Sequence, residues 1–325
     1  MSLEMCPYVC GIHGEELIRV GQKAVCSACP GPYEILDEIW LLDPVQRWDR
    51  SEFDTQVQIN PAPLDLSKAR KHLAAAGLDE LRNATILDVG CERGDLIESD
   101  RVQDSAVYAF DHSVESVRQA AGIARSSNGN SPYFSVQDAS KLYFSENFFD
   151  VVVGSAVLHH ILDYQSLLTS VYRILKPNGT AIFSEPFFGG YFWPCLFIKQ
   201  AAEELGFDLS QAEFGLSQTV VDLVAVIARE SEDPAALEKL ADKHFFQDAA
   251  IWKTAQQANF RSVSLSNAAP PEFYADWMEH FLDIYVIKHL GLRRAVLRQY
   301  ERMKTLAGPV LPELVSHFKY IVFRK

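Results

Sequence analysis

The fold is decided by residues 84–94, which read ATILDVGCERG. The stretch opens with a short apolar run that includes Asp88, and such a run predicts a buried strand. Gly90 and Gly94 then bracket a turn, where the absence of a Cβ lets the backbone come close to a ligand. A buried strand followed by a glycine turn predicts a nucleotide-binding crevice at the carboxyl end of a parallel sheet.

Acidic residues end the next apolar runs along the chain. The run 106–110 leads into Asp111, 23 residues after Asp88 (111 − 88), and the run 134–137 leads into Asp138. A carboxylate at the tip of the second strand can accept hydrogen bonds from both hydroxyls of a ribose. Because a glycine turn with a later acid also describes dinucleotide enzymes, the downstream sequence has to separate the two classes.

The downstream sequence favours one class. After Asp138 come an apolar run at 148–154, VLHHI at 157–161, a helical stretch at 167–175 and KPNG at 176–179. In order and spacing, the chain resembles the class I S-adenosylmethionine-dependent methyltransferases from about Asn83 to Glu185 and again at its C-terminus. This resemblance implies an α/β fold with a Rossmann-like, seven-stranded, mostly parallel sheet whose last strand is antiparallel.

The resemblance also implies which residues bind the cofactor, S-adenosylmethionine. They follow the strand ends and are Asp88, Gly90, Gly94, Asp111, Asp138 and Ser155. The first three would lie beneath the methionine part. The two later acids would bind the ribose and the adenine amino group, and the serine would stand beside the sulfonium.

Glu92 departs from the family pattern, which usually has glycine at this position. One interpretation is that its side chain turns to solvent or pairs with Arg93. The other is that a carboxylate here marks a degenerate, noncatalytic site. The retained Gly90, Gly94 and Asp111 favour the first interpretation.

His160 and Glu185 are the candidates for proton transfer, because the ends of the fourth and fifth strands face the transferred methyl group in similar enzymes. The implied reaction is an in-line displacement at the methyl carbon, which alignment in a dry pocket can promote. A base is needed only if the acceptor must lose a proton. The alternative role for the histidine is packing.

An aromatic stretch and a largely helical insertion follow the fifth strand. The rings are Phe187, Phe188, Tyr191, Phe192 and Trp193, and we expect a lid over about 187–243. Rings beside the methyl group predict a small, partly apolar or aromatic acceptor. The alternative is that they only anchor the lid to the core.

Four of the six cysteines lie near the N-terminus, at Cys6, Cys10, Cys26 and Cys29. Two close pairs of thiolates suit a tetrahedral zinc ion, and His13 is the substitute ligand if Cys10 points away. The segment resembles the small zinc ribbon before the catalytic domain of some ribosomal RNA methyltransferases and related small-molecule methyltransferases. We expect a structural zinc in an appended ribbon; free thiols are the alternative.

The predicted organisation is a zinc-ribbon-like segment at 1–45, a helical connector at 46–83 and a methyltransferase domain at 84–325. The net charge of −13 argues against a nucleic-acid partner, and no apolar run is long enough for a membrane span. We therefore expect a cytoplasmic enzyme that methylates a small molecule. The alternatives are a ribosomal RNA base methyltransferase, suggested by the ribbon, and a noncatalytic cofactor-binding scaffold, suggested by Glu92.

Overall fold

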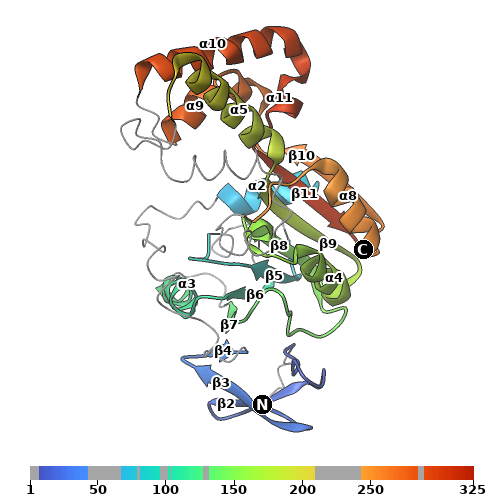
Figure 1. Cartoon of the computed structure of the whole chain (residues 1–325). Helices are drawn as coiled ribbons and strands as arrows, with labels where there is room; N and C mark the ends of the chain where they lie inside the picture. The colour runs from blue at the N-terminus through green and yellow to red at the C-terminus, as the bar shows by residue number, and fades with distance from the viewer. Residues whose placement is uncertain are drawn as a thin grey trace. The chain divides into compact units, whose positions relative to one another are not determined.

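Strand β5, Thr85–Val89, is the buried strand that the sequence predicts. In the computed structural model it pairs in parallel with β6, Ala106–Asp111, on one side and with β8, Phe149–Ser155, on the other (Figure 1). A strand with parallel neighbours on both sides is covered on both faces, which explains its continuous apolar run. The glycine turn therefore follows a strand that lies inside the sheet and not at its edge.

The structure describes residues 7–42, 67–78, 81–95, 102, 104–126, 132–208, 243–284 and 289–325, without the side chains at 29–32 and 126. The predicted connector and the predicted lid thus lie partly outside the described residues. The chain divides into two compact units. Unit 1 comprises Met1–Phe183, Ile251–Ser264 and Ile321–Lys325, and unit 2 comprises Ser184–Ala250 and Leu265–Tyr320.

Eleven strands among the described residues form one sheet, in the order β1-β2-β3-β4-β7-β6-β5-β8-β9-β11-β10. The strands not yet given are β1 Leu17–Val20, β2 Lys23–Cys26, β3 Cys29–Leu36, β4 Ile39–Leu41, β7 Tyr133–Val136, β9 Leu175–Pro186, β10 Ser262–Asn267 and β11 Phe318–Arg324. The pairs β4/β7, β6/β7, β5/β6 and β5/β8 are parallel. The result is a mixed α/β sheet with a largely parallel centre, as predicted, while the pairs β1/β2, β2/β3 and β3/β4 at one end are antiparallel.

Strand β11 is antiparallel to both of its neighbours. The Lys325 amide donates to the Gly179 carbonyl at 3.0 Å, and at the other end of the pair the Phe187 amide donates to the His317 carbonyl at 2.9 Å. From the first of these hydrogen bonds to the second, residue numbers rise along β9, from 179 to 187, and fall along β11, from 325 to 317. Hydrogen bonds at the two ends of β10 show the same sense against β11. The last strand is therefore antiparallel, in agreement with the sequence prediction.

The N-terminal strands extend this sheet, whereas the sequence analysis predicts seven strands and a separate ribbon. Strand β4 pairs in parallel with β7, and Ile39 and Leu41 lie in the same apolar core as β5. Tyr8 packs 4.8 Å from Trp40 and 5.2 Å from Phe144 between ring centroids. A short hairpin is marginal alone, and the β7 edge offers unpaired backbone groups, so docking satisfies both elements.

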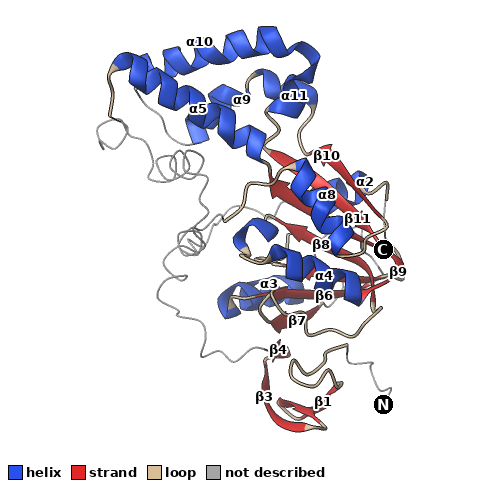
Figure 2. Ribbon diagram, turned by 45° about the vertical axis from the view of Figure 1, so that its right-hand side comes forward, coloured by secondary structure: helices blue, strands red, loops and turns tan. Residues whose placement is uncertain are grey.

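The helices flank the sheet in unit 1 and form most of unit 2 (Figure 2). They are α2 Ser67–Ala75, α3 Val114–Ser126, α4 Tyr164–Ile174, α5 Phe188–Leu205, α8 Asp248–Gln257, α9 Trp277–Ile284, α10 Leu290–Ala307 and α11 Leu311–Leu314, with short 3-10 turns at Leu158–His160, Pro271–Ala275 and Gly308–Val310. Helices α2 and α3 share one core with β5, β6 and β7. That core fixes the strand ends on which the candidate site is built.

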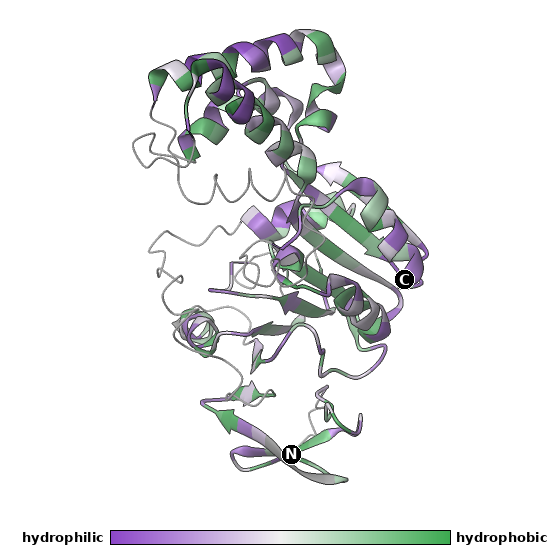
Figure 3. Ribbon diagram, viewed as in Figure 1, coloured by the Kyte–Doolittle hydropathy of each residue, from purple (hydrophilic) through white to green (hydrophobic). Residues whose placement is uncertain are grey.

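Unit 2 has a helical core of its own. Helix α10 alternates hydrophobic and hydrophilic residues along its length (Figure 3) and buries Leu292, Val296 and Tyr300 against α5 and α9. Tyr191 and Trp193 of α5 pack against the same core. Among the described helices, none has the length and hydropathy that a bilayer-crossing segment requires.

Candidate functional site

The glycine turn after β5 needs glycine at both predicted positions. Gly90 has φ +69°, and a Cβ there would lie 2.8 Å from Cγ2 of Val157. Gly94 has φ +92°, and its amide donates to the Cys91 carbonyl at 2.7 Å, which closes the turn. Any other residue would be strained at these φ values, and at Gly90 it would also be crowded.

Glu92 lies inside this turn with an exposed side chain and φ +45°. Its backbone amide donates to Oδ2 of Asp111 at 3.1 Å. The left-handed conformation explains why glycine is the easier residue here. Because the side chain is exposed, the structure supports the interpretation in which Glu92 turns to solvent.

Asp111 ends β6 and is held by three donors. Its Oδ1 accepts from the Ser113 amide at 2.9 Å and lies 3.2 Å from Nδ1 of His112, while Oδ2 accepts from Glu92. Burial raises the pKa of Asp111, but the bond and charge of His112 and the two amides hold it below its ordinary value. The same ion pair raises the pKa of His112 against the effect of burial.

His112 matters for the predicted ribose contact. A carboxylate has about four acceptor positions, so three bound donors leave room for about one ribose hydroxyl. A second hydroxyl needs the His112 ring to turn away from Asp111. The sequence analysis did not single out His112, although its place directly after the strand-end acid was a visible signal.

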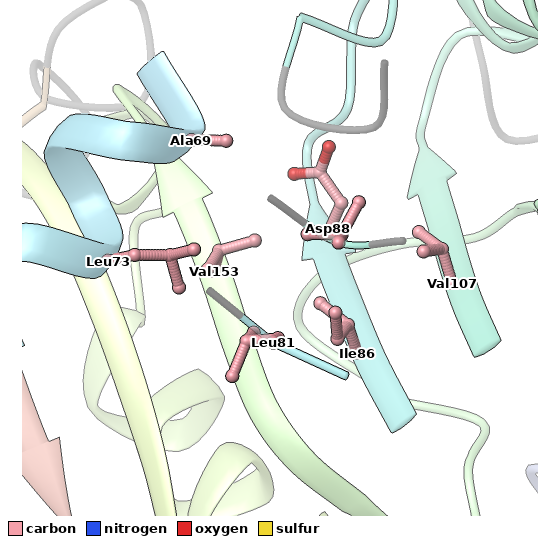
Figure 4. Close-up of a pocket in the computed structure, with 8 residues that line it drawn as sticks. Ala69, Leu73, Leu81, Ile86, Asp88, Val107 and Val153 are labelled. Carbon is pink, nitrogen blue, oxygen red and sulfur yellow. The ribbon is translucent and has the colours of Figure 1, made fainter. Parts of the chain in front are cut away.

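Asp88 is 2% exposed, and neither carboxylate oxygen has a hydrogen-bond partner among the described residues. Burial, together with the charge of Asp111, raises its pKa to about 8. The carboxyl group faces a small pocket lined by Ala69, Leu73 and Val153, among others (Figure 4). Because a buried acceptor without a donor is costly, this site fits a ligand that brings a cationic donor.

Asp138 and Ser155 complete the predicted row of strand ends. Asp138 follows β7, is half-buried, and accepts the Ser140 amide at 2.8 Å. Ser155 is the last residue of β8, and Ala156 after it has φ +55°. Parallel strands place their carboxyl ends at one edge of the sheet, so the structure brings the ends of β5, β6, β7 and β8 together there.

Residues 87–183 match the family model of a methyltransferase domain. This segment lies within the predicted methyltransferase domain, whose bounds of 84–325 stay a prediction. A ubiquinone biosynthesis O-methyltransferase of Vibrio vulnificus (strain YJ016) is 33% identical over 142 residues, which cover 42% of this chain and 56% of that protein. One from Neisseria meningitidis serogroup C is 29% identical with the same coverage. The chain thus spans 56% of the length of these relatives.

Two solved structures resemble the chain at a distance. Phosphoethanolamine N-methyltransferase 2 of Haemonchus contortus, bound to S-adenosyl-L-methionine, has a TM-score of 0.48 and 15% identity, covering 79% of this chain and 52% of that chain. The cyclase SpnF has a TM-score of 0.46 and 17% identity, covering 80% of each chain.

The two predicted proton-transfer residues lie in different units. His160 follows β8 of the methyltransferase domain, on the turn Leu158–His160, with an exposed ring 3.9 Å from the ring of buried His159. Glu185 is fully buried near the end of β9, in unit 2. Their catalytic roles stay predictions.

The N-terminal strands gather three of the predicted metal-ligating residues. Ligand atoms of Cys10, His13 and Cys26 lie within 4.8 Å of one another. Nδ1 of His13 is 3.7 Å from Sγ of Cys10 and 3.9 Å from Sγ of Cys26. A tetrahedral zinc with ordinary bond lengths has sulfur–nitrogen edges of about 3.6 Å, so this spacing fits the ion.

The other two predicted metal ligands cannot be placed in the same way. Cys6 lies outside the described residues, and the side chain of Cys29 does too. The Cys29 backbone stands directly opposite Cys26 in the β2–β3 pair. His13 therefore joins Cys10 in the group, whereas the sequence analysis considers it only as a substitute for Cys10.

Proposed function

We propose that this chain transfers a methyl group from S-adenosylmethionine to a small, partly apolar or aromatic acceptor. The observation that carries the proposal is the unpartnered, buried carboxyl of Asp88 at the glycine turn of a segment that matches a methyltransferase domain. The O-methyltransferase names of the relatives agree with an acceptor of this kind. Both the methyltransferase activity and the acceptor class are proposed here for the whole chain.

The residues of the crevice fit the chemistry of this cofactor. Asp88 would take the α-ammonium group, and the turn between Gly90 and Gly94 lets the backbone approach the methionine part. Asp111 would accept a ribose hydroxyl through Oδ2, while Asp138 would accept the adenine amino group. Ser155 would stand beside the sulfonium. When bound, the cofactor supplies an electrophilic methyl group.

The contribution of the chain to the reaction would be alignment and exclusion of water. An in-line approach of the acceptor needs no bond to the protein, so positioning supplies much of the rate enhancement. His160 and Glu185 are the proposed proton acceptors for an acceptor that must be deprotonated. The ring of His160 is exposed, whereas Glu185 is fully buried.

A small acceptor is favoured over ribosomal RNA by the charge of the N-terminal strands. A segment that binds RNA needs basic residues that are available to contact the phosphate groups. Arg19, one of the basic residues there, is already paired with Glu38 through two hydrogen bonds, of 2.5 and 2.7 Å. Arg19 and Lys23 are the two basic residues among residues 1–42, against six acids, so the net charge of this segment disfavours phosphate groups.

Methyl-labelled S-adenosylmethionine tests the proposed activity. The full chain is incubated with a fractionated small-molecule extract and, separately, with undermethylated ribosomal RNA. We expect label in the small-molecule pool. Label only in the RNA would favour the base methyltransferase. Cofactor binding without transfer to any acceptor class would favour the scaffold.

We also propose a structural zinc ion held by Cys10, His13 and Cys26, with Cys29 or Cys6 as the fourth ligand. A further sign is that the Ala28 amide points at Sγ of Cys26 at 3.4 Å, a contact that stabilises a metal-bound thiolate. Four protein ligands would leave no open position, so the ion would act on folding. Protein purified without chelators should contain about one zinc per chain, and less than about a tenth of an equivalent contradicts the proposal.

A further inference from the structure

Unit 2 contains a cavity of about 330 Å³ directly after β9. Its walls include Phe187, Phe188, Phe246, Asp248, Ser316 and Lys319. The volume lies within the range of small-molecule pockets, which runs from roughly 300 to 1,000 Å³. None of the residues predicted to bind the cofactor lines it.

Backbone pairing holds the aromatic walls in place. The Phe188 amide donates to the Phe246 carbonyl at 2.8 Å, and the Phe246 amide donates to the Pro186 carbonyl at 3.0 Å. Phe187 and Phe246 are both nearly fully buried, with ring centroids 6.3 Å apart. The backbone of this wall is therefore preformed, and half-buried Phe188, rather than the two buried rings, can offer apolar surface to a flat ligand.

The polar wall is a buried ion pair between β11 and the start of α8. Nζ of Lys319 donates to Oδ1 of Asp248 at 2.8 Å and to Oδ2 at 3.1 Å. The lysine side chain is 7% exposed, against 41% for the aspartate, so the carboxylate lies nearer to solvent. Nζ also lies 5.0 Å from the centre of the Phe187 ring.

This ion pair has hydrogen-bonding capacity left. An ammonium has three N–H donors and a carboxylate about four acceptor positions, so two bonds leave at least one donor and about two acceptor positions among the described residues. A hydroxyl group can use both, because it donates to the carboxylate and accepts from the ammonium. An anionic ligand would face the exposed carboxylates of Asp248 and Glu313, whereas a cationic ligand could pair with these carboxylates but would leave the donor of Lys319 unused.

We propose that this cavity binds a neutral hydroxylated aromatic molecule, with its ring against Phe188 and its hydroxyl on the Lys319–Asp248 pair. This binding goes beyond the proposed function and does not depend on it. The alternative is that the ion pair only ties α8 to β11.

The experiment is a ligand-observed NMR titration of the full chain with 4-ethylphenol, 4-ethylanisole and 4-ethylbenzylamine. The anisole keeps the ring but cannot donate a hydrogen bond, and the amine is cationic. We expect the phenol to bind at least about tenfold more tightly than the anisole, the scale of losing a hydrogen bond to a charged group, and more tightly than the amine, which cannot accept from Lys319. Equal binding of phenol and anisole, or no binding of phenol at millimolar concentration, overturns the proposal.

Two variants locate the binding. Lys319→Met keeps the aliphatic stem and should weaken phenol binding by about tenfold. Glu313→Gln is the matched control, because Glu313 lines the same cavity but lies 3.8 Å from Nζ, beyond hydrogen-bond range; its phenol affinity should stay within about twofold. Unchanged phenol affinity in Lys319→Met contradicts the site. If this variant fails to fold, the comparison of phenol with anisole on the native chain decides.

S-adenosylhomocysteine binding is measured on the same native sample. Cofactor binding without phenol binding overturns the cavity proposal alone. Phenol binding without cofactor binding supports the cavity and overturns the proposed function.

Discussion

Asp88 should release a proton when S-adenosylmethionine binds at pH 7. Its carboxyl is 2% exposed, and its pKa is about 8 because of burial and the charge of Asp111. In the proposed complex the cofactor ammonium lies against this carboxyl. An opposite charge within about 4–6 Å typically lowers the pKa of an acid by about 1–3 units.

The size of the release follows from these values. At pH 7 an acid with a pKa of about 8 is roughly 90% protonated, while a bound pKa of about 5–7 leaves roughly 1–50% protonated. Binding should therefore release about 0.4–0.9 proton per cofactor. The release should vanish above about pH 9, because Asp88 is then ionised in both the free and the bound protein.

Titration calorimetry at pH 7 in phosphate and in Tris measures this number, because the apparent enthalpy shifts with the ionisation heat of the buffer. Asp88→Asn is the matched control, since asparagine resembles the protonated acid in shape and charge. Its titration reports the groups other than Asp88, which include His112 and the cofactor's own amino group; the amino group takes up roughly 0.1–0.2 proton. A difference below about 0.1 proton between the native chain and Asp88→Asn would refute the reasoning.

Three further outcomes are expected. Asp111→Ala should weaken S-adenosylhomocysteine binding by about 1.5–3 kcal/mol in calorimetry, the cost of losing a charge-assisted hydrogen bond, and an affinity within about twofold of native would count against the ribose contact. Glu92→Gly should raise the free energy of unfolding in urea by about 1 kcal/mol, because glycine adopts φ +45° without strain; a lower value would show that the Glu92 side chain stabilises the turn. The pKa of Asp88 is raised in the folded state, so the folded chain keeps a proton that the unfolded chain loses above about pH 4, and stability should fall as pH rises towards 8. Asp88→Asn should reduce the decrease in the free energy of unfolding between pH 5 and 8. An unchanged pH dependence in this variant would show that other groups cause the decrease.

The central strands and the glycine turn could be predicted because their causes are local. The apolar run around Asp88 reports burial on both faces, and Gly90 reports a backbone that only glycine adopts easily. The acids at the next strand ends follow from the same periodicity. Each of these sequence signals lies within a few residues of the strand or turn that it predicts.

Long-range pairings left no such signal. Lys319 and Asp248 are 71 residues apart, and neither belongs to a motif. Strand β4 joins β7 across about a hundred residues, and only the free edge of β7 explains the pairing. The contact between His112 and Asp111, by contrast, joins neighbouring residues, so the sequence carries a signal for it, although spacing does not define the ring orientation on which the contact depends.

Equilibrium dialysis of the full chain against labelled S-adenosylmethionine tests most directly whether the ends of β5, β6, β7 and β8 form a cofactor site. We expect one equivalent of label retained per chain, displaced by S-adenosylhomocysteine and reduced in Asp111→Ala. The absence of retained label at millimolar cofactor, with the chain folded by circular dichroism, would contradict the site and the methyl transfer proposed from it.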